Sequence, residues 1–387
     1  MKFSLDESQA QVRELANKIL QEQVTEERLR DLDARDPGQR FDRDIWSQLA
    51  AAGLLGIAID ETYGGMGFDF FALSLLLEEV GRSVAAVPAA TTLAGAASVI
   101  QKYGSDAQKQ RLLPAVAVGD SVLTVALSEA MSSSNITPLT TNAVADGAGY
   151  KLNGVKHYVP YAEHADWIVV SAAVNAQENI LVLLDPKQTG VSLTSINTTN
   201  AEPQSILHMQ DVVIAADNIL AVSQQAGEAI QYAVNCMLSA YCTIQTGATD
   251  AATRMTAKYT GERKQFNVPI ASFQAVAQRA ADAYIDVECL RLCSQQAACL
   301  LSESNDSLSE QRAINDAISI AKVWAGDAGH RVSYTAQHLH GGTGVDREYP
   351  LWRYCLLLRQ MEFAMGCTQQ HLNDLGDRIA EYSVAMA

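Results

Sequence analysis

Cysteine is absent from the first 235 residues of the chain. All seven cysteines lie after that point, with no C-x-x-C pair and no regular spacing. A zinc site or a redox dithiol would need such spacing, so neither is expected. We expect reduced and mostly buried thiols, as in proteins of a reducing compartment.

Long apolar runs and an excess of cations are also missing. No run approaches the ~20 apolar residues of a membrane span, and the first residues carry acidic side chains where a signal peptide has an apolar core. Lysine and arginine total 28 against 44 aspartates and glutamates, giving a formal net charge of −16. This charge repels nucleic acid and anionic membranes at long range. The sequence therefore predicts a cytoplasmic protein that binds neither.

The spacing of apolar residues divides the 387 residues into three parts. Residues 1–120 show helical spacing, and residues 121–225 form short β-branched runs separated by turns. Residues 226–387 return to long alanine-rich segments whose wide apolar faces favour an antiparallel helical bundle. Within the β part, Asn153-Gly154 is the strongest local hairpin signal, so we expect a turn there.

Two motifs in the last third carry the most information, RKQFNVPIASFQ at 263–274 and HGGTGVDREYPLWRY at 340–354. Arg263 offers a planar, permanent charge suited to a pyrophosphate, and Phe266 offers a flat apolar contact. Gly341 and Gly342 offer a backbone that a nucleotide can approach without a Cβ in the way. Together they predict half of a flavin-nucleotide site.

Both motifs, in this order and at this separation, resemble signatures of the acyl-CoA dehydrogenase family. Further matches occur at ETYGGMGF (61–68), LLEEVGRS (76–83) and YGSDAQKQRLLPAVAVGD (103–120), so the resemblance covers essentially the whole chain. It implies an α+β fold with an N-terminal helical domain, a middle β-barrel or β-sandwich domain and a C-terminal four-helix bundle.

The resemblance also implies a function and a set of site residues. Family members use FAD to oxidise the α,β C–C bond of an acyl-CoA thioester and pass the electrons to an electron-transfer acceptor. Their FAD typically spans a subunit interface, so we expect a dimer or a dimer of dimers. The residues implied to bind the cofactor are Arg263, Phe266, Gln274, His338, Gly341, Gly342 and Thr368, although Asn267 stands where glycine is usual and His338 where glutamine is usual. No metal ligands are implied.

The flavin-facing elements of the chain itself depart from the family pattern. SEAMSSSNI at 128–136 keeps only Glu129 of an element that usually reads like TEPGAGSD. Pro160 and Tyr161 replace the threonine and asparagine of a second element, and proline has no N–H to donate to a flavin carbonyl.

The catalytic base is the sharpest departure. The family places a glutamate at one of two positions, and these carry Met237 and Met365 here. A thioether cannot accept the proton. The nearest carboxylates, Glu362 and Asp250, are weak candidates because they lie one or more helical turns away.

Three hypotheses remain open. The chain is the subunit of a heteromeric acyl-CoA dehydrogenase that supplies FAD contacts but no base, and its C-terminal sequence resembles the branch that acts on steroid side chains. Alternatively it is a self-sufficient homomeric enzyme with a non-standard base. The third hypothesis is a catalytically dead relative that binds an acyl thioester or a protein.

Overall fold

The computed structural model describes residues 4–130, 138–303 and 307–385. The chain folds into two compact units. One consists of residues 2–76 and 86–237, and the other of residues 77–85 and 238–387. The helices α4 (Phe70–Ser83) and α7 (Ser223–Glu262) contain residues of both units.

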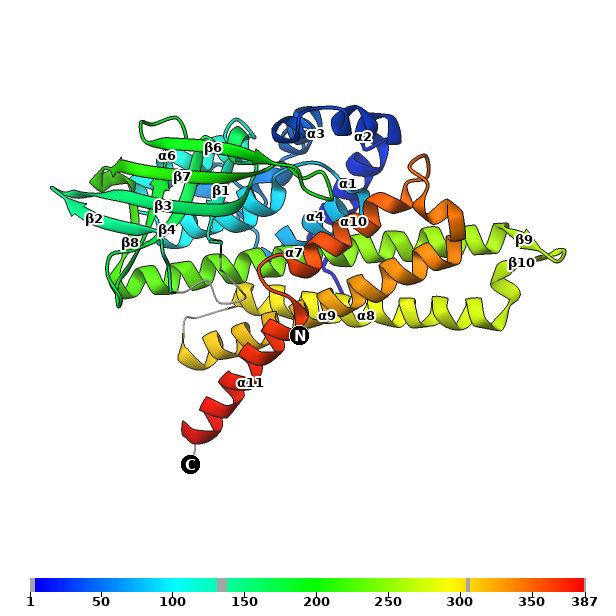
Figure 1. Cartoon of the computed structure of the whole chain (residues 1–387). Helices are drawn as coiled ribbons and strands as arrows, with labels where there is room; N and C mark the ends of the chain where they lie inside the picture. Colours follow the sequence, from blue (N-terminus) through cyan, green and yellow to red (C-terminus); the bar gives the residue numbers. More distant parts are fainter. Residues whose placement is uncertain (1–3, 131–137, 304–306, 386–387) are drawn as a thin grey trace. The chain divides into compact units, whose positions relative to one another are not determined.

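The first unit joins the N-terminal helices to a β-sheet (Figure 1). Its helices begin where capping side chains satisfy free N–H groups: Asp6 and Gln9 form a capping box for α1, and Ser105 and Gln108 form one for α6. Besides the first part of α4, the α- and π-helices of this unit are α1 (Glu7–Gln23), α2 (Glu26–Asp33), α3 (Arg43–Ala51), the π-helical η4 (Ala90–Ala97), α5 (Ser98–Tyr103) and α6 (Asp106–Ala117).

Eight strands form one sheet in this unit. The order is β6-β7-β3-β2-β4-β5-β8, with β1 paired to β4. β4 and β5 are buried along most of their length, which explains their nearly continuous apolar sequence. The strands are β1 (Leu123–Ala126), β2 (Asn142–Asp146), β3 (Gly149–Pro160), β4 (Trp167–Ala173), β5 (Asn179–Leu184), β6 (Val191–Ile196), β7 (Gln204–Ile214) and β8 (Ile219–Val222).

The hairpin predicted at Asn153-Gly154 is wrong. The turn between β2 and β3 lies earlier, because Asp146 pairs with Gly149 and Gly147 adopts a positive φ of 61°. Gly154 lies inside β3 at a shift in its register with β7, and a Cβ there would lie 2.7 Å from the backbone of Thr141. Asp146-Gly147 and Asn153-Gly154 both suit a turn locally. Asn153-Gly154 forms a bulge instead, because β3 pairs with the distant strand β7 on both sides of it.

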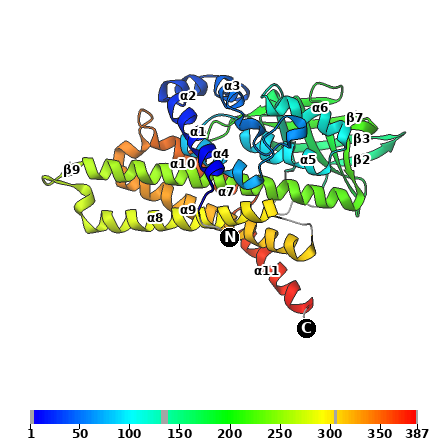
Figure 2. The same ribbon diagram turned by 180° about the vertical axis from the view of Figure 1, so that it is seen from behind.

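The second unit is a bundle of long helices (Figures 1 and 2). α9 packs against α8, α10 and α11. α7 is joined to α9 by the Gln245 side chain, which donates to the Ala325 carbonyl at 3.0 Å. The elements are α8 (Gln274–Glu303), α9 (Leu308–His340), α10 (Leu351–Phe363), α11 (Thr368–Ala385) and the two-stranded β9 (Lys264–Gln265) and β10 (Val268–Pro269).

Two glycines bring the end of α4 against α7 within this unit. A Cβ on Gly81 would overlap the Ile244 carbonyl, and one on Gly247 would overlap the Glu78 carbonyl. The close backbone approach places Glu78 and Arg82 beside the bundle interior. The predicted α+β fold, with an N-terminal helical part, a β part and a C-terminal bundle, is confirmed.

Candidate nucleotide-binding site

Arg263 opens a two-residue hairpin at the end of α7. β9 pairs with β10, and the two turn residues Phe266 and Asn267 have φ of 52° and 68°. Positive φ at both positions defines a type I′ turn. Asparagine is among the few side chains that tolerate this region, so Asn267 can replace the family's glycine without changing the turn. Phe266 is held there in a strained conformation.

The side chains of this hairpin are directed away from the chain. Phe266 is 90% exposed and meets only the edge of Phe273, with ring centroids 6.2 Å apart, among its aromatic contacts. Arg263 is exposed, and within the described ranges its guanidinium has no hydrogen bond or ion pair. A free guanidinium beside a free aromatic ring is suited to a ligand or a partner from outside.

The glycine-rich segment forms the 3-10 turn η8 (Gly341–Val345) directly after α9. Gly341 has a φ of 60°, and a Cβ built on either Gly341 or Gly342 would meet no atom within 4 Å. The backbone here borders open space. His338, in the last turn of α9, and Gln274, the first residue of α8, are both exposed. An exposed cation and an accessible glycine backbone fit the phosphate groups of a nucleotide.

Thr368 differs from the other predicted cofactor residues. It begins α11 and is half-buried, and a Cβ on Gly326 would overlap its Oγ1. Its hydroxyl therefore lies directly against α9 of the same chain.

Asp250, one candidate base, is surrounded by arginines. It forms ion pairs with Arg82, with Arg254 at 2.8 Å and with Arg291 at 3.3 Å. Arg291 and Arg82 also bind Glu78, so the group is a buried ionic network. These contacts occupy the carboxylate oxygens that a base needs free.

Glu362, the other candidate, is held in a similar way. Its Oε2 accepts from Arg359 at 2.6 Å, and its Oε1 lies 3.3 Å from the His330 Nδ1. Arg359 also contacts His330, whose ring stacks on Tyr334 with centroids 5.9 Å apart. The carboxylate is one member of a local charged cluster on α9 and α10.

The two methionines at the predicted base positions differ in burial: Met237 is buried and Met365 is half-buried. Met237 is buried in α7, and its sulfur lies 2.8 Å from the position of a Cβ built on Gly95 of the π-helical segment η4. Met365 adopts a φ of 55°, and its carbonyl lies 2.9 Å from the His371 Nε2. Burial, followed by the charge of Lys322, lowers the His371 pKa to about 4, so the imidazole is neutral and donates to that carbonyl.

Glu129 forms structural contacts within the first unit. Its carboxylate binds the fully buried Lys156 at 2.8 Å and accepts from the backbone N–H groups of Thr140 at 2.6 Å and Thr141 at 3.0 Å. Burial alone would raise the Glu129 pKa, but Lys156 and Thr140 hold it at about 2. Most of the surrounding element, residues 131–137, lies outside the described residues.

Pro160 ends β3 at the second flavin-facing element. Its carbonyl accepts from the Thr124 hydroxyl at 2.6 Å. Tyr161, which follows, is buried against Phe41 with ring centroids 5.9 Å apart.

Sequence reasoning missed Tyr259 and Tyr349, which surround His340 beside the glycine-rich turn. The four-residue spacing from Tyr259 to Arg263 is one helical turn and was an available signal. Among the described residues no group of three or more His, Cys, Asp or Glu side chains is arranged to hold a metal ion. Nor does any described helix have the length and apolarity to cross a membrane.

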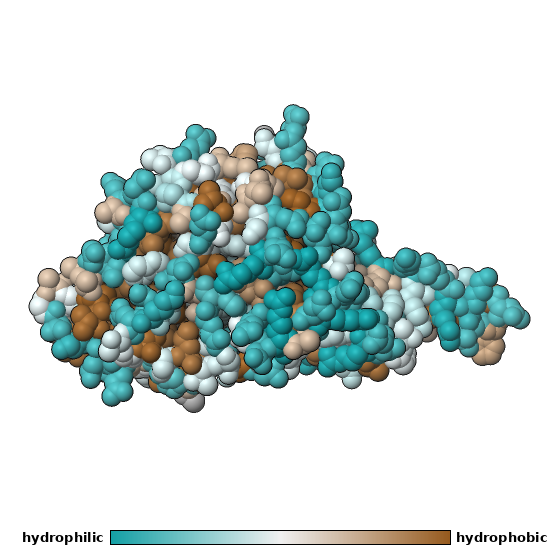
Figure 3. Space-filling model, turned by 90° about the horizontal axis from the view of Figure 1, so that it is seen from above, coloured by the Kyte–Doolittle hydropathy of each residue, from teal (hydrophilic) through white to brown (hydrophobic). Residues whose placement is uncertain are grey.

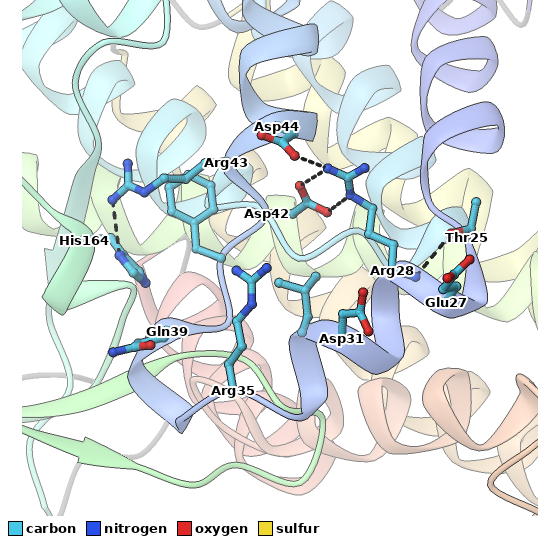
Figure 4. A pocket seen from close by; sticks show the side chains of 12 residues that line it. Thr25, Glu27, Arg28, Asp31, Arg35, Gln39, Asp42, Arg43, Asp44 and His164 are labelled. Carbon is cyan, nitrogen blue, oxygen red and sulfur yellow. Dashed lines mark hydrogen bonds and ion pairs between the residues drawn. The ribbon is translucent and has the colours of Figure 1, made fainter.

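A polar pocket of about 490 Å³ lies elsewhere, in the first unit (Figure 4). Arg28 donates from Nε to Asp42 at 2.5 Å and from Nη2 to Asp44 at 2.6 Å. Arg43 lies 3.4 Å from the His164 Nδ1. The lining carries charges of both signs and includes none of the residues predicted to bind the nucleotide.

The face shown in Figure 3 is mainly hydrophilic, with apolar side chains in small separate groups. Among the described large apolar side chains, Phe266 has the highest exposure. It lies at the tip of the hairpin between α7 and α8 (Figure 2).

Comparison with known proteins defines the class to which this geometry belongs. Three family models match the chain: the acyl-CoA dehydrogenase N-terminal domain over residues 6–120, the middle domain over 124–212 and the C-terminal domain over 208–380. The chain belongs to the acyl-CoA dehydrogenase family, whose members are FAD-dependent oxidoreductases acting on CH–CH bonds.

Particular relatives refine this assignment. The chain is 34% identical to acyl-CoA dehydrogenase FadE27 of Mycobacterium tuberculosis, over 98% of this chain and 99% of the relative. Its structure matches a chain of the ChsE4-ChsE5 complex from Mycobacterium tuberculosis with a TM-score of 0.91 and 33% identity, covering 98% and 99% of the two chains. A chain of the Tcur3481-Tcur3483 steroid acyl-CoA dehydrogenase matches with a TM-score of 0.89 and 35% identity over the same shares.

Proposed function

We propose that this chain is the subunit of a heteromeric acyl-CoA dehydrogenase that contributes FAD contacts and no catalytic base. One observation carries the proposal. Arg263 and the backbone at Gly341 and Gly342 are exposed and free within the described structure, whereas Met237 and Met365 occupy both base positions. One half of a shared site is kept and the other half is lost.

In this proposal the residues of this chain mainly contact the FAD that a partner subunit binds. FAD, when bound, supplies the acceptor for the hydride that leaves the β-carbon of the acyl-CoA. Arg263 would neutralise the pyrophosphate charge, Phe266 and Gln274 would contact the nucleotide, and the backbone of Gly341 and Gly342 would face the phosphates. The partner's carboxylate removes the α-proton, and a trans-2-enoyl-CoA results. Electrons leave to an electron-transfer acceptor.

The relatives support a bulky substrate and a second subunit. Two of the similar structures are named as two-protein assemblies, and one of them is described as a steroid acyl-CoA dehydrogenase. We propose that the acyl group is of this large, polycyclic class and that the partner is a second acyl-CoA dehydrogenase chain with an intact base.

A self-sufficient homomer is the second candidate. It would require Asp250 or Glu362 as the base, yet arginines bind both carboxylates. Releasing Asp250 from this buried network would leave several guanidinium groups without their counter-charge, which is costly. The contacts therefore favour the heteromer.

The deciding experiment compares the isolated chain with the chain co-expressed with a base-bearing family member. Flavin per protein and acyl-CoA-dependent dye reduction are measured for both. We expect little flavin and little turnover from the isolated chain, and one flavin per heterodimer with rapid turnover from the pair. Steady turnover by the isolated chain, lost in Glu362→Gln or Asp250→Asn, would establish the homomeric enzyme instead.

A further inference from the structure

Three aromatic side chains connect the ends of α7 and α9 with the segment before α10. Tyr259 stacks on His340, with ring centroids 4.3 Å apart and an interplanar angle of 26°. The Tyr349 ring lies 5.1 Å from that of His340 and 6.3 Å from that of Tyr259. His340 and Tyr349 are nine residues apart, whereas Tyr259 lies 81 residues before His340, so its ring joins α7 to a segment distant in sequence.

The hydrogen bonds of His340 have a defined direction. Its Nδ1 lies 2.8 Å from the Ala336 carbonyl oxygen, which can only accept, so Nδ1 carries the proton. Nε2 is then an acceptor, and the Tyr349 hydroxyl donates to it at 3.1 Å. Burial lowers the His340 pKa and raises the Tyr349 pKa, which keeps the imidazole neutral and the phenol protonated, as this arrangement requires.

The same rings are adjacent to both parts of the candidate nucleotide site. The Tyr259 carbonyl accepts from the Arg263 N–H at 2.8 Å, at the point where the hairpin begins. His340 immediately precedes Gly341. The Tyr259 hydroxyl lies 3.4 Å from the His340 carbonyl and 3.5 Å from the Thr343 Oγ1, at the long limit of hydrogen bonding. Tyr259 therefore contacts the start of the hairpin through its backbone and the start of the glycine-rich turn through its side chain.

We propose that Tyr259, His340 and Tyr349 are positioning residues that fix the Arg263 hairpin and the glycine-rich turn in one relative geometry. This inference rests on the proposed function, because the ligand that both parts reach is the FAD pyrophosphate. The arrangement orders the two parts before the nucleotide binds, so less ordering entropy is lost on binding.

Simple core packing is the competing explanation. Tyr349 also packs against a buried apolar cluster that includes Val332, Ala336 and Leu351. A plain aromatic ring would fill that space equally well. The phenol hydroxyl and the imidazole nitrogens add direction, so substitutions that keep an aromatic ring but remove the hydrogen bonds separate the two explanations.

Tyr349→Phe and His340→Phe are the informative variants, and Tyr334→Phe is the matched control. Tyr334 lies on the same helix as His340 but is exposed and stacks on His330. Hydrogen exchange is measured on the full chain, and FAD affinity on the complex with its base-bearing partner. We expect each variant to speed exchange at residues 263–270 and 341–345. FAD binding should weaken about five-fold in Tyr349→Phe, which loses one neutral hydrogen bond, and by more in His340→Phe, which loses two. The control changes neither quantity.

Three results would overturn the inference: exchange that increases only near residue 349, exchange that increases uniformly over the bundle, or no change at all. If Tyr349→Phe lowers global stability, His340→Phe, which keeps a ring in place, decides the question. Arg263→Ala separates this inference from the proposed function. If Arg263→Ala weakens FAD binding while Tyr349→Phe and His340→Phe leave it unchanged, only the positioning role is wrong. Unchanged binding in Arg263→Ala sinks the proposed function and the inference with it.

Discussion

The bundle holds arginines in two different environments. Around Asp250, the guanidinium groups of Arg82 and Arg291 are mostly buried and bind carboxylates. At the end of α7, Arg263 is exposed beside a strained hairpin and no ion pair holds it among the described residues. Buried charges require partners because desolvation is costly, whereas an exposed charge does not. Arg263 is therefore available to a ligand, whereas Arg82 and Arg291 are not.

Two buried lysines differ in the kind of partner that binds them. Lys156 is fully buried and binds the Glu129 carboxylate. Lys322 is also fully buried, but its Nζ donates to the backbone carbonyls of Met361 at 2.5 Å and Glu362 at 3.4 Å. It stabilises the C-terminal end of α10, where the helix leaves carbonyls without partners. Burial lowers its pKa to about 8.

The largest expected effect follows from breaking the buried group. Asp250→Ala removes the carboxylate shared by three arginines, and it should lower the free energy of unfolding by about 3–5 kcal/mol. Arg263→Ala should change it by less than about 0.5 kcal/mol, as expected for an exposed side chain. Urea denaturation followed by circular dichroism measures both. Equal losses of unfolding free energy in Asp250→Ala and Arg263→Ala would contradict the difference between the buried and the exposed arginines.

The pH dependence of stability tests Lys322, whose partners are backbone carbonyls and not a carboxylate. The Lys322 pKa is lowered in the folded protein, so the unfolded chain binds more protons between pH 8 and 10.5. Stability from this group should therefore rise by up to about 3 kcal/mol across that window. The difference between the wild type and Lys322→Met isolates it. The comparison is needed because burial raises the pKa of the Cys236 and Cys242 thiols to about 12, which acts in the opposite direction. A difference that is flat with pH would contradict the prediction.

Flavin retention tests the exposed arginine directly. In the complex with a base-bearing partner, Arg263→Ala should weaken FAD binding about 10- to 100-fold, the loss expected for a charge-assisted hydrogen bond. Arg254→Ala is the matched control, because Arg254 is an exposed arginine on the preceding helix α7 that pairs with Asp250 at 2.8 Å. Fluorescence titration of the deflavinated complex measures both. Equal losses would show that the effect is one of general charge.

Local chemistry made the order of helical, β and helical regions predictable, whereas the hairpin after Arg263 was not predicted. Helical spacing, β-branched runs and turn residues are read within a few positions of one another. The turn at Asn153-Gly154 was mispredicted because a strand more than 50 residues away determines the register of β3. The partners of Asp250 were out of reach for the same reason, since Arg82 precedes it by 168 residues.

The candidate site was predicted in part because its motifs are contiguous. Arg263, Phe266, Gly341 and Gly342 lie on two short segments that the family resemblance identifies, and the structure places them on a hairpin and an open turn. Their role in binding FAD stays a prediction. Tyr259, His340 and Tyr349 come from the ends of α7 and α9 and the segment before α10, and no local pattern specifies that they meet.

The smallest expected effect concerns the hairpin turn itself. Asn267 has a φ of 68°, a conformation that glycine adopts freely and alanine adopts at a cost of about 1–2 kcal/mol. Asn267→Gly should therefore leave the free energy of unfolding within about 0.5 kcal/mol of wild type and keep FAD binding by the complex. Asn267→Ala should open the hairpin locally, with faster hydrogen exchange at residues 263–270 and unchanged exchange in the centre of α9. Because Arg263 loses its fixed position, the alanine variant should also bind FAD a few-fold more weakly. Were alanine and glycine to behave alike in exchange and in FAD binding, the type I′ turn would have no part in presenting the arginine.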